Sequence, residues 1–346
     1  MPKPSPRSPL IDVLFVIVPH ALLLDIAGPA EALRLVNLRC TDRGQPPRFR
    51  LRFAGPVPQT RASVGLTLAA LEPLPRALSS PTWVVLPGQP SAQLPHVTRP
   101  IIDTAKWLNA TMRSTIQGRP SRAAAARDRL VTICSGTLLA ARAGLVDQRR
   151  CTTHHDLLQQ LRGLAPRAHV VDNRVYVVDG ALASSAGITA GIDLMLHLIA
   201  EECGEAMAAG VAEDMVVYLR RSSNDPEMSP FLAHRRHLHG AVHKVQNAIS
   251  AEPERNWDMA SLAAIGHVTE RHLLRLFLSN AGVSPLNYLR AIRLELARES
   301  IDHGASVSRA AEMAGFTSSL QLRRAWSRHW GGSPSDSDVG RATAGS

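Results

Sequence analysis

The chain has 346 residues, 45% of them hydrophobic, and is therefore long enough for two domains with separate cores. Its formal net charge of +10 favours a polyanionic partner, either nucleic acid or an anionic membrane surface. Arginine supplies nearly all of the positive charge, a bias that genomic base composition explains equally well. The four cysteines lack CxxC spacing, so neither a zinc site nor a disulfide framework is indicated. We expect no metal and no cofactor.

The first residues and the first apolar run bear on where the protein acts. Residues 1–9 contain too many prolines for a signal peptide, and the apolar run at residues 10–18 is too short to span a bilayer. We therefore expect a cytoplasmic protein with reduced thiols and no membrane partner.

Residues 10–217 alternate apolar strands with helices. In chain order the pattern predicts a strand at 10–18, a helix at 27–37, strands at 49–54 and 83–88, a helix at 101–112, a strand at 130–134, a helix at 136–143, a hairpin of strands at 176–180 and 181–185, and a helix at 192–209. Such alternation gives a parallel sheet with helices on both faces. The N-terminal fold is thus predicted to be α/β, a flavodoxin-like parallel-sheet sandwich.

The composition changes after this domain. Residues 220–230 are polar and contain two prolines, which is typical of a linker, and strand signals disappear beyond them. We therefore predict an α/β domain at 10–217, a linker at 218–233 and an all-α domain at 234–338.

Two helix-turn-helix units stand out in the all-α domain, at residues 259–280 and 307–330. Each consists of a short alanine-rich helix, a turn and an amphipathic helix with arginines on its polar face. Proteins use this arrangement to lay the second helix in the major groove of DNA. The doubling predicts contact with two successive major-groove segments about one helical turn apart.

In the first unit, capping and apolar positions predict which face is buried. Asp258 and Thr269 are expected to cap the two helices. Leu273, Leu276 and Phe277 are expected to face the core. The outer face then presents the candidate DNA contacts Arg271, His272 and Arg275.

A longer helix at residues 285–303, started by Ser284-Pro285, is expected to hold the two units at a fixed separation. In the second unit, Ser318 is expected to cap a helix that buries Leu322 and Trp326. The outer face of that helix presents the candidate DNA contacts Ser319, Gln321, Arg323 and Arg324.

Many positions of this region follow one pattern. In the first unit and the helix after it they are Leu262-Ala263, Arg271-x-Leu-x-Arg-x-Phe277, Gly282-x-Ser-Pro285, Tyr288-Leu289, Arg293-Leu294 and Ala297-Arg298. In the second unit they are Val307, Ala310-Ala311, Ala314-Gly-Phe316, Arg324-x-Trp326 and Trp330-Gly-x-Ser-Pro334. With these residues the region resembles the AraC/XylS family of transcriptional regulators, which implies sequence-specific binding to double-stranded DNA.

Three departures from the family pattern lie in or after the second unit. Leu322 and Trp330 stand where the family usually has phenylalanine, and Ser337-Asp338 replaces a Tyr-Arg ending. We therefore expect the second unit to pack or hold DNA less tightly than the first.

The N-terminal domain has a cysteine at a strand-to-helix turn, in the run Thr132-Ile-Cys134-Ser-Gly136. Folds of the α/β class place strained nucleophiles at such turns, and the positive end of the following helix is expected to lower the pKa of the thiol. His154 lies in the later run Cys-Thr-Thr-His-His, and Asp25 follows the first strand.

These elements resemble the PfpI-type branch of the class I glutamine amidotransferase-like superfamily, and residues 188–193 match the same branch. In that branch a cysteine, a histidine and an acidic residue meet at the carboxyl edge of the sheet. The resemblance covers about residues 11–215 and extends to GlxA-type regulators and, among enzymes, to isocyanide hydratase. It implies that Cys134 is the nucleophile position, His154 the histidine position and Asp25 its acidic partner.

Two departures weaken the enzymatic interpretation. Leu86-Pro-Gly88-Gln89 stands where the enzymes have a Gly-Gly pair whose amides supply an oxyanion hole, and His155 replaces an aromatic residue. We therefore predict that Cys134, His154 and Asp25 bind a small metabolite and that the protein is not an enzyme.

Together the two domains predict a transcriptional regulator, an activator, that binds promoter DNA as a homodimer and contacts RNA polymerase. A small-molecule effector in the N-terminal domain is expected to shift the pose of the domains or the geometry of the dimer. The alternative is a cysteine-dependent hydrolase or hydratase whose basic domain only localises it. A Cys134→Ala variant separates the two, because the regulator should still bind its operator.

Overall fold

The computed structural model describes residues 10–78, 81–118, 128–187, 189–217, 234–235, 237, 239–302 and 304–334. The chain forms two compact units, residues 1–227 and 228–346. The predicted linker at 218–233, the proline-rich start and Ser337-Asp338 lie outside the described residues. Within the part of the chain that is described, no helix is long and apolar enough to cross a membrane.

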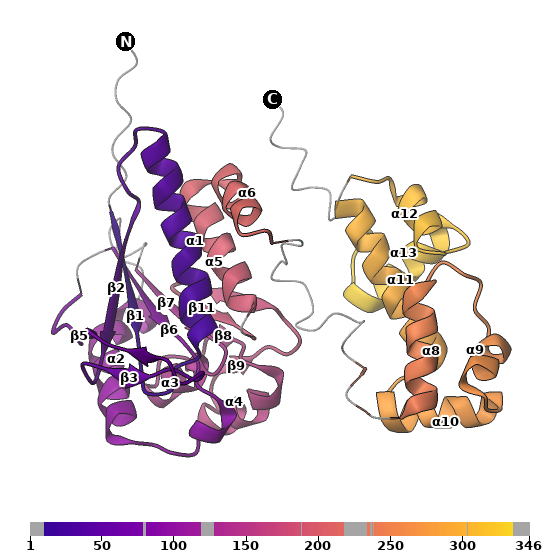
Figure 1. Ribbon diagram of the computed structural model, residues 1–346, viewed down its shortest axis with the longest axis horizontal. Helices are drawn as coiled ribbons and strands as arrows, with labels where there is room; N and C mark the ends of the chain where they lie inside the picture. The colour runs from indigo at the N-terminus through magenta and orange to yellow at the C-terminus, as the bar shows by residue number, and fades with distance from the viewer. Residues whose placement is uncertain are drawn as a thin grey trace, which may run out of the picture. The chain divides into compact units, whose positions relative to one another are not determined.

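A seven-stranded sheet runs through the N-terminal unit, in the order β10-β11-β7-β6-β1-β2-β5 (Figure 1). Its strands are β1 (Ile11–Val16), β2 (Phe49–Gly55), β5 (Glu72–Pro73), β6 (Thr82–Leu86), β7 (Arg129–Ile133), β10 (Tyr176–Asp179) and β11 (Leu182–Ser185). Neighbouring strands are parallel except in the β10–β11 hairpin. The predicted parallel sheet and its hairpin are confirmed.

Two further pairs of short strands were not predicted. They are β3 (Thr60–Arg61) with β4 (Thr67–Leu68), and β8 (Arg150–Cys151) with β9 (His169–Val170). A strand of two residues is too short to show an alternation of apolar and polar side chains, so the sequence pattern does not reveal it.

Helices cover both faces of the seven-stranded sheet, as predicted. One face carries α1 (Leu23–Asp42), α5 (Ala190–Cys203) and α6 (Glu205–Asp214), and the other carries α2 (Arg99–Gln117), α3 (Gly136–Arg142) and α4 (Leu158–Leu164). Alternate residues of β1 enter the two cores, with Val13 and Phe15 in the first and Leu14 and Val16 in the second. Because both faces are buried, the strand reads as a continuous apolar run.

The single helix predicted at residues 192–209 is in fact two helices, α5 and α6, which meet at Gly204. Gly204 has φ +88°, a conformation that residues with a side chain rarely adopt. Both helices bury apolar residues in the same core, so the hydrophobic pattern continues through the break and did not show it. Helix α1 also starts earlier than predicted, at Leu23 rather than at residue 27.

The C-terminal unit is helical throughout its described elements. They are α8 (Gly240–Ala251), α9 (Met259–Gly266), α10 (Glu270–Ala281), α11 (Pro285–Asp302), α12 (Val307–Met313) and α13 (Ser319–Trp330). Helix α11 contributes Tyr288 and Ile292 to the core around α8, α9 and α10, and Leu294 and Ala297 to the core around α12 and α13. One continuous helix therefore fixes the spacing of the two helix-turn-helix units, α9–α10 and α12–α13.

The predicted caps are present in both units. Each accepts a hydrogen bond from an amide of the first turn: Asp258 from Ser261 at 2.8 Å, Thr269 from His272 at 3.3 Å and Ser318 from Gln321 at 3.2 Å. The predicted buried faces are also confirmed, by Leu273, Phe277, Leu322 and Trp326. Leu276 is only partly buried, because it lies at the edge of its core.

Candidate functional site

A tight turn joins β7 to α3 and contains Cys134. Cys134 has φ +53°, a strained conformation for a residue with a side chain, and only 6% of it is exposed. Its amide donates to Ser185 O at 3.0 Å, and its carbonyl accepts from Thr153 Oγ1 at 2.8 Å. Glycine is required at Gly136, because a Cβ there would lie 2.1 Å from Leu86 O. The turn is a rigid elbow pressed against the end of β6.

Asp25 lies in the first turn of α1 and is completely buried. Its Oδ2 accepts a hydrogen bond from Gly88 N at 2.9 Å, whereas Oδ1 has no partner among the described residues. Burial raises the pKa of Asp25 to about 7, and the hydrogen bond from Gly88 opposes that shift. A Cβ on Gly88 would lie 3.0 Å from this carboxylate and 2.8 Å from Ser135 Oγ, so Asp25 lies next to the elbow.

Two backbone amides after β6 are already bound within the protein. Gly88 N donates to Asp25, and Gln89 N donates to Ser135 Oγ at 2.6 Å. The serine hydroxyl donates in return to Gln89 O at 2.8 Å, and Gln89 Nε2 donates to Pro19 O at 2.6 Å. An oxyanion hole needs donors aimed at the reacting atom, whereas these two amides are aimed at protein oxygens.

His154 lies beside the elbow, because the preceding residue, Thr153, contacts Cys134 O. Its Nδ1 accepts from Asp156 N at 3.3 Å and caps the 3-10 helix η3 (His155–Leu157). The side chains of His154, His155 and Asp156 offer ligand atoms within 4.8 Å of one another. Such a set has the chemistry to hold a metal ion, but consecutive residues in a capping turn also come together without one.

The N-terminal unit has two hollows along α3, and only the first is lined by elbow residues. The first, lined in part by Gln89, Ser135 and Arg142, has a volume of about 20 Å³. The second is an open groove of about 550 Å³ whose lining includes Ile101, Lys106 and Arg142. The first hollow has room for one water molecule and not for a metabolite.

The outer face of α10 presents polar side chains opposite the buried Leu273 and Phe277. Arg271 and Arg275 are exposed, and the half-buried His272 contacts Arg275, with 3.2 Å between Nδ1 and Nη2. Among the described residues, Arg271 has no hydrogen bond or ion pair. An exposed guanidinium of this kind keeps its donors available for a partner.

The outer face of α13 presents Arg323 and Arg324, both exposed, opposite the buried Leu322 and Trp326. Arg324 forms no hydrogen bond or ion pair with any described residue. Arg323 makes a long contact with Ser333, 3.5 Å from Nη1 to Oγ. Both units therefore expose arginines on the face turned away from their cores.

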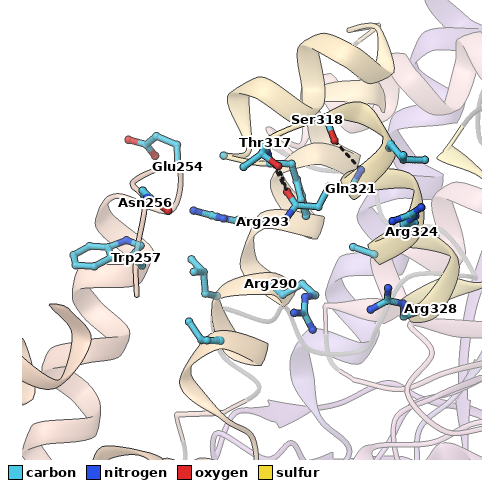
Figure 2. A pocket seen from close by; sticks show the side chains of 16 residues that line it. Glu254, Asn256, Trp257, Arg290, Arg293, Thr317, Ser318, Gln321, Arg324 and Arg328 are labelled. Atoms are coloured by element: carbon cyan, nitrogen blue, oxygen red, sulfur yellow. Dashed lines mark hydrogen bonds between the residues drawn. The ribbon is translucent and has the colours of Figure 1, made fainter. Parts of the chain in front are cut away.

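The two polar residues predicted near the start of α13 differ in how they are held. Ser319 is partly exposed at the first helical position. Gln321 folds back on the cap, since its Oε1 accepts from Thr317 N at 2.8 Å and from Thr317 Oγ1 at 3.1 Å (Figure 2). The carbonyl oxygen of Gln321 is thus engaged within the protein, and its amide nitrogen is the group left to meet a partner.

A groove of about 750 Å³ lies between α11, α13 and the loop before α9 (Figure 2). Arg290 of α11 and Arg324 and Arg328 of α13 line it, and all three are exposed. Sequence reasoning did not find this groove, because its walls come from three segments that lie more than twenty residues apart along the chain. The groove extends the basic surface of α13 onto the helix that connects the two units.

Arg293, one of the matched positions of the family pattern, contacts protein atoms. Its Nε donates to Pro253 O and its Nη2 to Arg255 O, each at 2.7 Å. Burial lowers the pKa of Arg293. The residue ties the loop before α9 to α11, so its role is to hold the first unit together.

Comparison with known proteins gives two domain matches. Residues 262–337 match a family model described as a helix-turn-helix domain, and residues 119–201 match the DJ-1/PfpI family. A solved AraC family transcriptional regulator from Pseudomonas putida aligns with a TM-score of 0.44 and 20% identity, over 60% of this chain and 100% of that one.

Curated relatives align over nearly the whole chain. The HTH-type transcriptional regulator GbdR of Pseudomonas aeruginosa is 28% identical over 98% of this chain and 86% of its own length. The regulator GlxA of Rhizobium meliloti is 27% identical over 92% and 93%. Isonitrile hydratase of Pseudomonas putida is 42% identical over 24% of this chain and 36% of the enzyme. The chain therefore combines a helix-turn-helix domain with a DJ-1/PfpI domain, and over nearly its whole length it is similar to HTH-type transcriptional regulators.

Proposed function

We propose that α10 and α13 are the recognition helices of this regulator and enter two successive major-groove segments of a promoter. The observation that carries the proposal is the set of exposed arginines on both helices, opposite core residues. A guanidinium binds a guanine edge or a phosphate with two hydrogen bonds. The proposed contacts are Arg271, Arg275, Arg323 and Arg324.

Three further side chains are proposed to lie near base edges or phosphates. His272 supports Arg275 through their contact and adds a donor or acceptor beside it. Ser319 lies at the start of α13, and residues near the start of a recognition helix approach base edges in this fold. Gln321 donates through its amide nitrogen, because its oxygen is engaged by Thr317.

The arginine-lined groove beside α13 is proposed to hold DNA backbone. Arg290 and Arg328 line the same groove as Arg324, so a strand that follows the recognition helix would pass between them. Phosphate contacts position a protein on the duplex without selecting its sequence. In this proposal Arg290 and Arg328 set affinity, while arginines on the recognition faces also set specificity.

We propose that the N-terminal domain binds a small metabolite at the elbow. Three buried oxygens near the turn have no hydrogen-bond partner among the described residues: Asp25 Oδ1, Thr152 Oγ1 and Ser185 Oγ. A binding site needs convergent polar groups of this kind, and a ligand or an ordered water that donates hydrogen bonds would satisfy them. Cys134 and His154 are the further candidate contacts.

Entry of a metabolite requires the edge of the sheet to open. Asp25 is completely buried, and the hollow beside Ser135 holds about 20 Å³. A ligand that binds only the opened form shifts the population toward it, and this shift is the signal that we propose reaches DNA binding.

The remaining expectations belong to the same proposal. A homodimer would place two copies of the DNA-binding domain on one promoter, and contact with RNA polymerase would make the protein an activator. Because promoter DNA and RNA polymerase lie in the bacterial cytoplasm, the proposal also places this protein there.

A hydratase is the second candidate, favoured by the 42% identity to isonitrile hydratase over a quarter of the chain. Against turnover stand the amides of Gly88 and Gln89, which donate to Asp25 and Ser135 instead of pointing to a substrate oxyanion. We therefore propose binding without turnover.

Selection of duplexes from a random-sequence pool by the full-length protein tests the DNA proposal. We expect enrichment of two short motifs separated by about 10 base pairs, one helical turn. Failure to enrich any sequence at low salt would contradict specific binding through these helices.

Thermal-shift screening with small nitrogenous and amino-acid-like metabolites tests the ligand proposal, because a compound that binds the native state raises its stability. Asp25→Asn should reduce the shift, whereas Asp42→Asn, an exposed acid at the end of the same helix, should retain it. Steady product formation abolished by Cys134→Ala would instead establish an enzyme.

A further inference from the structure

Helices α10 and α13 begin at equivalent caps, Thr269 and Ser318, and bury equivalent positions. The fourth residue after the cap is a buried leucine in both helices, and the eighth is a buried aromatic residue. These residues are Leu273 and Phe277 in α10, and Leu322 and Trp326 in α13. The outer faces can therefore be compared position by position.

The outer faces of α10 and α13 carry the same residue type at one position, and at two other positions arginine and leucine are interchanged. Both helices have an exposed arginine at the sixth position after the cap. At the second position α10 has Arg271 and α13 has Leu320, whereas at the fifth position α10 has Leu274 and α13 has Arg323. At these three positions each helix thus presents two arginines and one leucine, with the leucine at a different position.

Both leucines are exposed to solvent, Leu274 by 39% and Leu320 by 55%. At 3.6 residues per turn, the second, fifth and sixth positions fall within one stripe of the helix surface. The leucines therefore lie among the arginines, and Leu320 also lines the arginine groove. Neither side chain stabilises a core from this position, so its apolar surface is stabilised only when a partner covers it.

We propose that Leu274 and Leu320 contact the C5-methyl groups of thymine in the major groove, one in each segment. This inference rests on the proposed role of α10 and α13 as recognition helices. Thymine presents a methyl group at the major-groove edge, whereas guanine presents two acceptors that suit arginine. A stripe of two arginines and one leucine therefore matches a short run of guanines and one thymine.

The exchange of positions makes the two DNA segments unequal. The second and fifth positions are separated by about 4.5 Å along a helix axis, which rises 1.5 Å per residue. That distance is on the order of one base-pair step of 3.4 Å. In each segment the thymine lies at a fixed distance from the guanine that the arginine at the sixth position contacts. This distance therefore differs by about one base pair between the segment contacted by Leu274 and the segment contacted by Leu320.

Replacing thymine by deoxyuridine removes only the methyl group and tests the proposal directly. The probe is the duplex that the full-length protein enriches from a random pool, with each thymine replaced in turn. In each segment one replacement should weaken binding about fourfold, the effect of leaving one methyl group uncovered. Leu274→Ala should remove this sensitivity in one segment only, and Leu320→Ala in the other. Met313→Ala, which removes an apolar side chain exposed by 52% and lying outside α10 and α13, is the control and should change neither.

Three outcomes would overturn the proposal. They are a parent protein insensitive to every uracil, leucine variants that keep both sensitivities, and variants that weaken all duplexes alike. The uracil replacements are measured with the parent protein, so they test the thymine contacts even if a leucine variant fails to fold. If Arg275→Ala and Arg324→Ala also bind DNA like the parent, the assignment of α10 and α13 as recognition helices is wrong. If those two variants bind more weakly but no uracil replacement has an effect, only the proposed thymine contacts are wrong.

Discussion

The cysteine elbow and the outer faces of α10 and α13 both gather polar side chains, but they use them in opposite ways. At the elbow, the Asp25 carboxylate, two backbone amides and the Ser135 hydroxyl bind one another, and Asp25 is buried. On α10 and α13, the proposed recognition helices, Arg271 and Arg324 are exposed and bind no other described residue. The first site stabilises the fold before anything binds, whereas the second gains interaction energy only from a partner.

This difference indicates how each site responds to its surroundings. A ligand at the proposed elbow site would enter only if the edge of the sheet opened, so the protein would rearrange on binding, and a rearrangement can be passed to another domain. DNA replaces water and counterions around exposed arginines. We therefore expect salt to act mainly on DNA binding and protonation of buried groups to act mainly on the N-terminal domain.

The largest expected effect is that of salt on DNA affinity. If the arginine faces and the groove together make about six phosphate contacts, affinity should fall about a thousandfold between roughly 50 and 200 mM salt, because each contact releases counterions. Fluorescence anisotropy with a labelled duplex measures this. Arg328→Ala should lower the slope by about one contact for every sequence. A flat response would show that the exposed arginines do not carry the affinity.

The pH dependence of stability tests the buried site, the cysteine elbow with Asp25. The pKa of Asp25 is about 7 in the folded protein, against 3.8 for an ordinary aspartate. Because the folded state binds this proton more tightly, the contribution of Asp25 to stability is fully present below about pH 4 and is lost as the pH rises toward 7. The loss is up to about 4 kcal/mol, at 1.36 kcal/mol per pKa unit.

Urea unfolding at several pH values, compared between the parent and Asp25→Asn, isolates this contribution. The parent should lose stability relative to the variant between about pH 4 and 7, and the difference should level off above that range. Asp42→Asn, at an exposed position in α1, should follow the parent. A difference between parent and Asp25→Asn that does not change with pH would mean that Asp25 is ionised normally.

Much of the fold follows from local sequence. Alternating apolar runs predicted the parallel sheet, and the capping residues Asp258, Thr269 and Ser318 predicted three helix starts, because these signals act within a few residues. The break at Gly204 was missed, since the apolar pattern continues on both sides and only the positive φ of the glycine separates the helices.

The sites were predictable only in part, because contacts between distant segments build them. The sequence indicated Cys134 and Asp25 as site residues through a family resemblance. It did not indicate that Ser135 binds Gln89 or that Asp25 binds Gly88, pairs separated by 46 and 63 residues. The exposed arginines of α10 and α13 were easier to predict, because their exposure depends on the period of a single helix.

Loss of single arginines should have an intermediate effect. Arg275→Ala and Arg324→Ala should each weaken operator binding by about 1–3 kcal/mol, the range for a lost bidentate base contact. Lysine at the same positions retains the charge but not the two-pronged geometry, so it should restore phosphate contacts more than base contacts. Both alanine variants should unfold at the parent temperature, since both side chains are exposed. Early melting would show that these residues support the core instead.

The smallest expected effect is that of Cys134 on DNA binding. Cys134→Ala should leave operator affinity without ligand within about twofold, below the roughly 1 kcal/mol scale of one lost hydrogen bond. The reason is that the thiol lies in the N-terminal core, while the arginines proposed to contact DNA belong to α10 and α13. The same variant should change the thermal shift produced by any metabolite that binds the elbow. Arg142→Ala, beside the small hollow but not at the elbow itself, serves as the matched comparison. If Cys134→Ala abolishes DNA binding while the protein stays folded, the buried site contributes to DNA binding even without ligand, and the separation between the two sites is wrong.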